Sequence, residues 1–265
     1  MEQLIKTVVL GIIQGFTEWL PISSSGHLNI AEKILGMNVP LIFDVILHLA
    51  TLTVIMLFFR NDVKNILSAL IHLDFETEYG NFIPIIVVGT LPTAILGLAF
   101  SIFLENVFQD ALTLAFAFIV CGTVLYSTRF GEAKTSSISF FAAFTIGIAQ
   151  GIAVIPGLSR SGLTISLALL LGIEREKAFK FSFLLSIPAV IGAFGLTFYR
   201  HFGELTASGL GLVEISAGAS AAAVIGYLAL KLLWRILSGK KFHVFAFYCW
   251  MAGAFILLAF ALGVL

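Results

Sequence analysis

Six stretches of about 20 residues carry almost no charge, and this feature most restricts what the chain can fold into. A helix that crosses a bilayer needs roughly 20 consecutive apolar residues. Only 11% of the residues are charged and 59% are hydrophobic, whereas a soluble domain has about 25% charged residues. We therefore expect an all-α polytopic membrane protein with six spans, at about 41–60, 82–104, 111–128, 178–200, 211–235 and 243–264.

Two further apolar segments are interrupted. The apolar stretch 4–19 runs into "PISSSG" and continues as a short run to Gly36, and 138–155 runs into "PGLSRSG" and continues to Gly172. The half-segments are short for spans, and irregular backbone at membrane depth must be buried in protein or line a wet cavity. We expect each segment to form a re-entrant helical hairpin.

The two interrupted segments match each other at one offset of 136 positions without a gap. Gln14-Gly15 meets Gln150-Gly151, and Ser23, Ser25 and Gly26 meet Ser159, Ser161 and Gly162. This predicts one integral membrane domain, 1–265, built from two repeats at about 1–130 and about 137–265. Each repeat has one hairpin and three spans, an odd number, so the second repeat enters the membrane inverted.

Basic residues are distributed unevenly between the two sides of this predicted topology. Eleven fall on the side that follows the first span and three on the other, and cytoplasmic loops are the side enriched in Lys and Arg. We therefore expect a multi-pass protein of the cell membrane with both termini outside the cytoplasm. The eleven are Arg60, Lys64, Arg129, Lys134, Arg175, Lys177, Lys180, Lys231, Arg235, Lys240 and Lys241; the three are Lys6, Lys33 and Arg200.

Charge and cysteine content exclude several other classes. The formal net charge is zero, so no basic surface for nucleic acid is expected. The two cysteines lie in apolar runs and form neither a zinc-binding spacing nor a disulfide framework. The bilayer is the expected partner.

The ionisable residues within the interrupted segments are candidates for function, because charge at membrane depth is costly. If the two breaks face each other, the first offers Glu18 and His27 and the second offers Arg160. An arginine, several hydroxyls and helix N-termini together suit a phosphate. The hydroxyls are those of Ser23, Ser24, Ser25, Ser159, Ser161 and Thr164.

The same residues could react. A serine beside an imidazole can act as a nucleophile, with the histidine as general base. Glu18 could orient His27 or bind a divalent cation. Since Glu18 is the one carboxylate clearly in place, Mg²⁺ or Ca²⁺ would bind mostly through substrate phosphates and water.

Structural alternatives exist for each of these residues. Ser25 and Ser161 could be packing residues beside glycines, and His27 could cap a helix. Glu18 could lie at the membrane interface, and Arg160 could reach the surface. Outside the breaks, His48 is expected to be a satisfied polar residue of its span. Asp44 is either an N-cap or a residue at the mouth of the site, whereas Gln14 and Gln150 are expected to complete backbone hydrogen bonds.

Two motifs resemble those of a known family. "QGFTEWLPISSSGH" resembles the first signature of the undecaprenyl-diphosphate phosphatases of the bacitracin-resistance type, and "PGLSRSGLT" resembles their second. "FDVILHLATL" and "FSFLLSIPAVIGA" are similar to further stretches of that family. The resemblance covers nearly the whole chain, and the pair of signatures is specific.

The resemblance implies six spans plus two re-entrant hairpins, and hydrolysis of the terminal phosphate of a polyprenyl diphosphate. The monophosphate carrier lipid would be recycled for cell-wall or surface-glycan synthesis, with bacitracin resistance as a consequence. Glu18, Ser24, His27 and Arg160 would be the catalytic core, assisted by Mg²⁺ or Ca²⁺, and the protein would form a homodimer. Substrate-binding residues would be Gln14, Ser23, Ser25, Gly26, Ser159, Ser161 and Thr164.

Three points stay open at this stage. Gln14 stands where many members of that family have Glu, which leaves any direct metal-ligand role to Glu18. Either Ser24 attacks phosphorus with His27 as base, or His27 acts directly on phosphorus or on water. Inverted repeats are also the plan of secondary transporters, so a lipid-phosphate or anion transporter or scramblase is the alternative function.

Overall fold

The computed structural model describes residues 1–37, 39–103, 110–207 and 210–263, and these form an α-helical bundle. An isolated bridge between Thr135 and Ile173 is the one β-type pairing in this described part of the chain. The helices are α1 (Glu2–Trp19), α2 (Ser24–Leu35), α3 (Leu41–Phe58), α4 (Arg60–Ile71), α5 (Glu78–Phe103), α6 (Ala111–Ser127), α7 (Phe140–Ile152), α8 (Arg160–Leu170), α9 (Arg175–Ala207), α10 (Leu212–Ser238) and α11 (Phe245–Ala261), with 3-10 turns at Thr128–Phe130 and Phe242–Val244.

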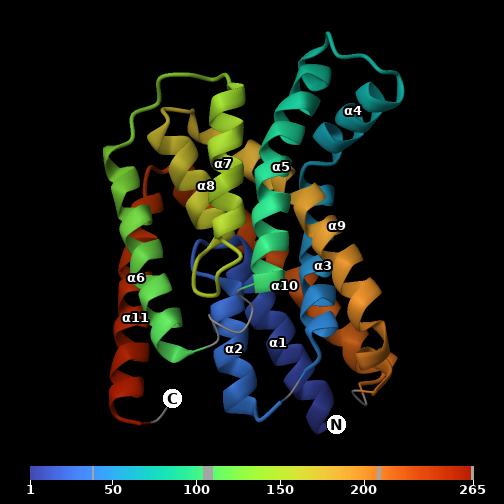
Figure 1. Ribbon diagram of the computed structural model, residues 1–265, viewed down its shortest axis with the longest axis vertical. Helices are drawn as coiled ribbons and strands as arrows, with labels where there is room; N and C mark the ends of the chain where they lie inside the picture. Colours follow the sequence, from blue (N-terminus) through green and yellow to red (C-terminus); the bar gives the residue numbers. More distant parts are fainter. Residues whose placement is uncertain (38, 104–109, 208–209, 264–265) are drawn as a thin grey trace.

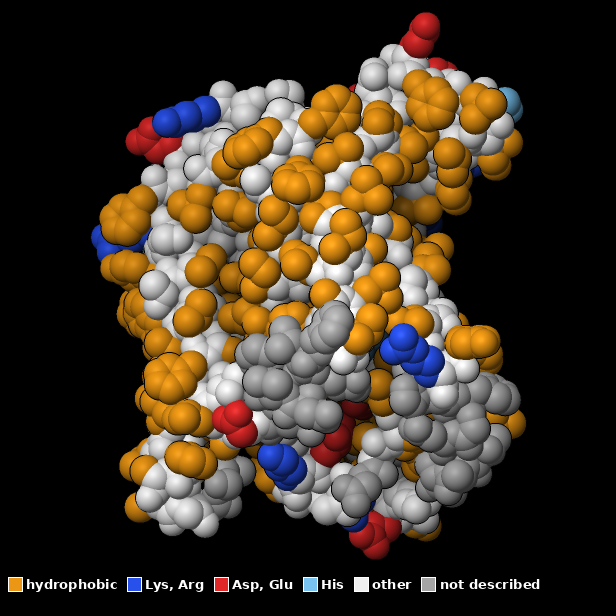
Figure 2. All heavy atoms as spheres, viewed as in Figure 1, with side chains coloured by type: hydrophobic (Ala, Val, Ile, Leu, Met, Phe, Trp, Pro, Cys, Tyr) orange, Lys and Arg blue, Asp and Glu red, His pale blue; other side chains and the backbone are white. Residues whose placement is uncertain are grey.

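Six helices, α3, α5, α6, α9, α10 and α11, are long and apolar enough to cross a membrane. They correspond to the six predicted spans, although the predicted ends at residues 104 and 264 lie outside the described residues. Apolar side chains cover much of the face seen in Figure 2, and charged side chains lie toward its two ends. The chain is thus a multi-pass helical membrane protein, as predicted.

The interrupted segments form two pairs of helices. The expectation of short half-segments holds for α2, α7 and α8 but is wrong for α1, which has 18 residues, as many as α3. α8 has 11 residues and α7 has 13, so each is well short of a bilayer core of about 30 Å at about 1.5 Å per residue. α1 and α2 lie at the end of the molecule that holds the N-terminus and the end of α11, and α7 and α8 lie at the other end (Figure 1). The two breaks, residues 20–23 and 153–159, meet between them.

Glycines let the first helix of each pair pack tightly on a long helix. A Cβ added to Gly11 of α1 would lie 2.1 Å from the backbone oxygen of Gly218 in α10. A Cβ added to Gly147 of α7 would lie 2.0 Å from the backbone oxygen of Gly89 in α5. Small residues at such crossings allow backbones to approach closely in membranes, so α1 is fixed against α10 and α7 against α5.

Trp19 anchors the first break in the core. Its side chain is fully buried, and its ring meets Phe183 of α9 edge-on, with centroids 5.4 Å apart. An edge-to-face pair of this kind adds to the apolar burial of two large side chains. Because Glu18 directly precedes Trp19, this packing also fixes the direction in which the Glu18 carboxylate points.

Helix α4 was not anticipated by the sequence reasoning. It follows α3 directly and projects from the bundle in Figure 1. Arg60, Asp62 and Lys64 gave it too much charge for a span. One side of it nevertheless exposes Leu67, Leu70 and Ile71. A helix that is apolar on one side and charged on the other suits a membrane surface rather than its interior.

Candidate active site

Each break starts its second helix with the same serine cap. Ser23 Oγ accepts the backbone N–H of Gly26 at 3.3 Å, and Ser159 Oγ accepts that of Gly162 at 3.1 Å. A capping serine satisfies one of the N–H groups that a helix N-terminus leaves free. The matched "SSSG" and "SRSG" sequences therefore form the same cap hydrogen bond twice, although the backbone differs, with φ +66° at Ser23 and −98° at Ser159.

The two breaks are also bonded to each other. Gly157, in the second break, donates its backbone N–H to Ser23 Oγ at 3.1 Å. Gly157 has φ +94°, and a Cβ there would lie 2.7 Å from Ala117 Cβ. This position therefore requires glycine on both conformational and steric grounds.

Glu18 is the centre of the polar cluster between the breaks. Ser24 Oγ donates to Glu18 Oε2 at 2.6 Å, and Gln14 Nε2 donates to the same oxygen at 3.1 Å. The other oxygen, Oε1, accepts from Arg160 Nη2. His48 Nε2, from α3, lies 3.3 Å from Oε2. With its side chain 4% exposed, Glu18 is a buried carboxylate held by four groups, not an interfacial one.

Arg160 is held in place but retains unused hydrogen-bonding capacity. Its guanidinium lies 5.4 Å from the Trp19 ring centre, within range of a cation–π interaction. Its Nη1 is buried and has no hydrogen-bond partner among the described residues. Since buried donors normally find partners, Nη1 marks a place where an anionic ligand could bind.

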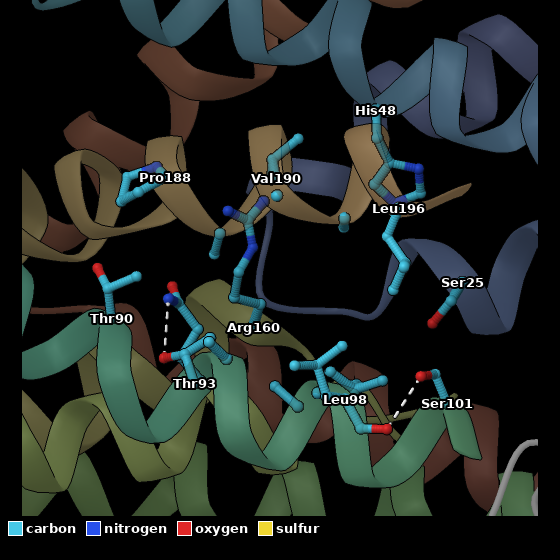
Figure 3. A pocket seen from close by; sticks show the side chains of 18 of the residues that line it. Ser25, His48, Thr90, Thr93, Leu98, Ser101, Arg160, Pro188, Val190 and Leu196 are labelled. Atoms are coloured by element: carbon cyan, nitrogen blue, oxygen red, sulfur yellow. Dashed lines mark hydrogen bonds between the residues drawn. The ribbon is translucent and has the colours of Figure 1, made fainter. Parts of the chain in front are cut away.

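The cluster lies at the wall of a cavity of about 510 Å³. Figure 3 shows Arg160 between α5, which carries Thr90, Thr93 and Leu98, and α9, which carries Pro188, Val190 and Leu196. His48 and Ser25 point into the same space from α3 and α2. The cavity thus combines a charged wall with a long apolar surface, which suits an amphiphilic ligand.

The sequence-predicted residues divide between the cavity and its supports. Glu18, Ser24, Ser25, Ser159 and Arg160 line the cavity. The supporting residues lie behind this lining and bond to it: Gln14 holds Glu18, Ser23 and Gly26 form the first cap, Ser161 contacts Ser159 Oγ at 3.2 Å, and Thr164 Oγ1 donates to the Arg160 carbonyl at 2.8 Å.

His27 points elsewhere. Its Nδ1 lies 2.7 Å from the Ser23 carbonyl oxygen, and its Nε2 lies 2.5 Å from the Tyr248 hydroxyl. The ring also stacks on Tyr248 at 5.7 Å, and His27 is not among the residues that line the cavity. The expected Ser24–His27 hydrogen bond is not formed, because Ser24 bonds to Glu18 and α11 supplies the partner of His27.

Two residues with open interpretations, Asp44 and Gln150, are also placed. Pro40, not Asp44, is the N-cap of α3, and the Asp44 backbone carbonyl accepts from His48. Gln150 Nε2 donates to Thr93 Oγ1 at 3.3 Å and to the Leu185 carbonyl at 3.4 Å. These bonds join α7 to α5 and α9, so Gln150 does not complete the backbone of its own broken helix.

His48 is the functional candidate that sequence reasoning missed. A histidine in an apolar span usually satisfies a local backbone group, and one of its nitrogens does so. The signal in the sequence was that His48, like Glu18, is an ionisable residue at membrane depth. Neither the distance along the chain nor the repeat indicated that α3 would bring the two side chains together.

The donor set does not suit a cation held by the protein alone. No group of three or more His, Cys, Asp and Glu side chains that could hold a metal occurs in the described part of the chain. Both Glu18 oxygens already accept from Arg160, Ser24 and Gln14. Mg²⁺ and Ca²⁺ prefer several free oxygen ligands, which this carboxylate does not offer.

Fold and site together define a polytopic membrane protein with a buried Glu–Ser–Arg site beside an apolar cavity. The chain belongs to the bacitracin resistance protein BacA family, whose model matches residues 7–255. It is similar to the undecaprenyl-diphosphatase of Carboxydothermus hydrogenoformans, with 40% identity over 97% of this chain and 98% of the relative. It is also similar to those of Methanosphaera stadtmanae (38% identity, 96% of each chain) and Korarchaeum cryptofilum (35%, 96% and 98%).

Proposed function

We propose that this protein hydrolyses the terminal phosphate of undecaprenyl diphosphate, or of a similar polyprenyl diphosphate. The product is the monophosphate carrier lipid, which is recycled for cell-wall or surface-glycan synthesis, and bacitracin resistance follows from removal of the diphosphate. The observation that carries this proposal is the free Arg160 Nη1 next to the Ser24–Glu18 hydrogen bond. The names of the family and of its relatives agree with it.

The reaction begins with Ser24. As Ser24 Oγ attacks the terminal phosphorus, its proton passes to Glu18 Oε2, to which it is already hydrogen-bonded at 2.6 Å. The bond between phosphorus and the bridging oxygen breaks, and the polyprenyl monophosphate leaves. Water then attacks the phosphoserine, inorganic phosphate leaves, and Ser24 regains a proton. Arg160 Nη1 and the N–H groups of α2 and α8 stabilise the phosphoryl oxygens.

His27 has a supporting role in this scheme. Its Nε2 is bonded to Tyr248 and its Nδ1 to the Ser23 carbonyl, so it fixes the start of α2 where Ser24 lies. A role for His27 as base or nucleophile stays a prediction, and it would need the ring to leave Tyr248.

The apolar part of the cavity is proposed to receive the first isoprene units of the substrate. Gly97 of α5 and Gly192 of α9 line it, and a Cβ on either would meet nothing closer than 4.0 Å. The lipid would enter sideways between these helices. A divalent cation, Mg²⁺ or Ca²⁺, is proposed to arrive with the diphosphate, since the protein side chains do not form a binding site for it.

The inverted repeat, with α1–α2 and α7–α8 as re-entrant hairpins, is proposed as the origin of this site. The matched serine caps, Gly11 and Gly147 packed on α10 and α5, and the placement of the two helix pairs at opposite ends support it. Ser24 and Arg160 hold equivalent positions at the offset of 136. The repeats would thus have diverged to supply a nucleophile and an anion-binding group.

The proposed topology comes from the charge distribution of the sequence, and the proposed homodimer and outer-face access come from the family resemblance. The distribution of basic residues supports termini outside the cytoplasm. The start of α1 and the end of α11 lie at the same end of the molecule (Figure 1). We propose phosphate access from the outer face and a homodimer in the cell membrane.

Release of phosphate from a polyprenyl diphosphate in detergent micelles tests the function. Micelles have no two sides, so a transporter or scramblase without hydrolytic activity would release none. The parent protein should release phosphate and the monophosphate lipid, and Arg160→Ala should nearly abolish this while remaining folded. If Arg160→Ala released phosphate at a rate within a few-fold of the parent, the assignment of this cluster as the active site would be wrong.

A further inference from the structure

His48 is the ionisable residue of the cavity lining that this scheme leaves without a role. It comes from α3, outside both breaks, and its side chain is 28% exposed and directed into the cavity (Figure 3). Its Nε2 lies 3.3 Å from Glu18 Oε2, the oxygen that also accepts from Ser24. His48 therefore contacts the group that we propose as the base.

The other nitrogen of the ring determines where the protons lie. His48 Nδ1 is 2.8 Å from the backbone carbonyl oxygen of Asp44. A carbonyl oxygen can only accept, so Nδ1 must carry a hydrogen. In a neutral ring, Nε2 would then present a lone pair to the Glu18 carboxylate at 3.3 Å, which is unfavourable. The contact requires a proton between the two atoms.

The Glu18 carboxylate is already surrounded by donors. Glu18 Oε2 already accepts from Ser24 and Gln14, and Oε1 accepts from Arg160. A carboxylate bound by three donors is stabilised in its charged form. A hydrogen on Nε2 would let His48 donate to Glu18 while Nδ1 donates to the Asp44 carbonyl.

His27 shows the contrasting case. Its Nδ1 also faces a carbonyl, that of Ser23, but its Nε2 faces the Tyr248 hydroxyl, which can donate. A neutral ring satisfies both contacts of His27. Of these two histidines, His48 is the one with a carboxylate where the lone pair of a neutral ring would be.

Among the described residues packed around His48, no further charge opposes this assignment. On the elements around it, Glu18 of α1 and Arg160 of α8 face the cavity, and Asp44 lies one turn earlier on α3. The part of α10 packed on α3, from Gly218 to Gly226, has no ionisable residue, and neither has the cavity-lining part of α9, Pro188 to Thr197.

We propose that His48 is a positioning residue of this reaction, which holds Glu18 through Oε2 while Arg160 holds Oε1, and which adds a second positive charge beside the diphosphate. The inference rests on the proposed function. The cluster of Glu18, Arg160 and His48 carries one net positive charge, which favours a polyanionic phosphate group over an uncharged lipid headgroup.

Two substitutions separate the hydrogen bond from the charge. His48→Leu removes both, and we expect kcat/KM for a polyprenyl diphosphate to fall roughly 10- to 100-fold, as for a lost bond to a charged group. His48→Gln can still donate to Glu18 but is uncharged, so kcat should largely recover while KM stays raised. His72→Gln is the matched control, because His72 makes the same bond to a carbonyl four residues earlier, 2.8 Å from Ser68, on the exposed α4.

Nitrogen-15 NMR of histidine-labelled protein in micelles measures the protonation of each ring nitrogen directly, without an activity assay. The His48 signals, assigned by their absence in His48→Gln, should show both nitrogens protonated near neutral pH. In Glu18→Gln they should change to a neutral ring protonated at Nδ1. A neutral His48 in the parent, or His48→Leu with the activity of His72→Gln, would overturn the proposal. A parent that releases no phosphate would remove the proposed function instead, and the NMR result alone would then decide the inference.

Discussion

Glu18 and Arg160 form a buried ion pair across the two breaks although they are 142 positions apart in the chain. Each comes from a helix end that is too irregular to cross a membrane unless it is covered by protein. This contact joins the two helix breaks into one site, in which Ser24 binds the same carboxylate.

Arg160→Lys should preserve the charge opposite Glu18 but remove the planar fork that leaves Nη1 free. We expect a folded protein whose phosphate release falls about 100-fold, because lysine cannot bind Glu18 and a phosphate bidentately. Steady-state hydrolysis in micelles measures this. Arg129→Lys, at an exposed arginine bonded to the Tyr126 hydroxyl, is the control and should match the parent. Arg160→Lys with a similar rate would show that charge alone suffices.

Gly147→Ala should destabilise the protein, because the new Cβ would lie 2.0 Å from the Gly89 backbone oxygen. Overpacking of this kind costs about 1–3 kcal/mol. Thermal unfolding in detergent should show a lower midpoint. Gly195→Ala on α9, where a Cβ would meet nothing within 4 Å, should leave it unchanged or slightly raised. Equal midpoints for the two variants would contradict the close α5–α7 crossing.

Gly157→Ala should separate the two breaks. The substitution combines a positive φ with a Cβ 2.7 Å from Ala117 Cβ, and the Gly157 N–H that binds Ser23 would have to move. The rate of phosphate release should fall at least about tenfold, which corresponds to about 1.4 kcal/mol in the activation free energy. The free energy of unfolding should fall by less than this. Gly36→Ala has φ +60° with open space around it, so it reports the conformational cost alone. Similar activities would mean that the Gly157–Ser23 bond has no part in catalysis.

Tyr248→Phe distinguishes the two candidate bases. It removes the donor 2.5 Å from His27 Nε2 but leaves Ser24 on Glu18. With Glu18 as base, the rate of phosphate release should change by less than about threefold. This is well under the tenfold change that about 1.4 kcal/mol of activation free energy would give. Ser24→Ala should reduce it to background. A large gain in Tyr248→Phe, at unchanged thermal stability, would return His27 to the reacting centre, because a reacting His27 has to leave Tyr248.

The sequence predicted the spans well, because each is a long apolar run whose type does not depend on tertiary contacts. It also indicated Glu18, Ser24 and Arg160 as cavity residues. It misplaced His27 and undervalued His48, since the direction of a side chain depends on which helix packs beside it. Tyr248 lies 221 residues after His27, and no local pattern links the two. Helix α4 was missed because an amphipathic helix on a surface lacks the signal of a span.

The stereochemistry of phosphate release tests the central claim, that Ser24 forms a covalent intermediate, most directly. A polyprenyl diphosphate whose terminal thiophosphoryl group is made chiral with oxygen isotopes would be hydrolysed in water of a third isotope. Two successive in-line displacements, at Ser24 and then by water, predict overall retention of configuration at phosphorus. Inversion would mean that water attacks the diphosphate directly, and would contradict the role assigned to Ser24.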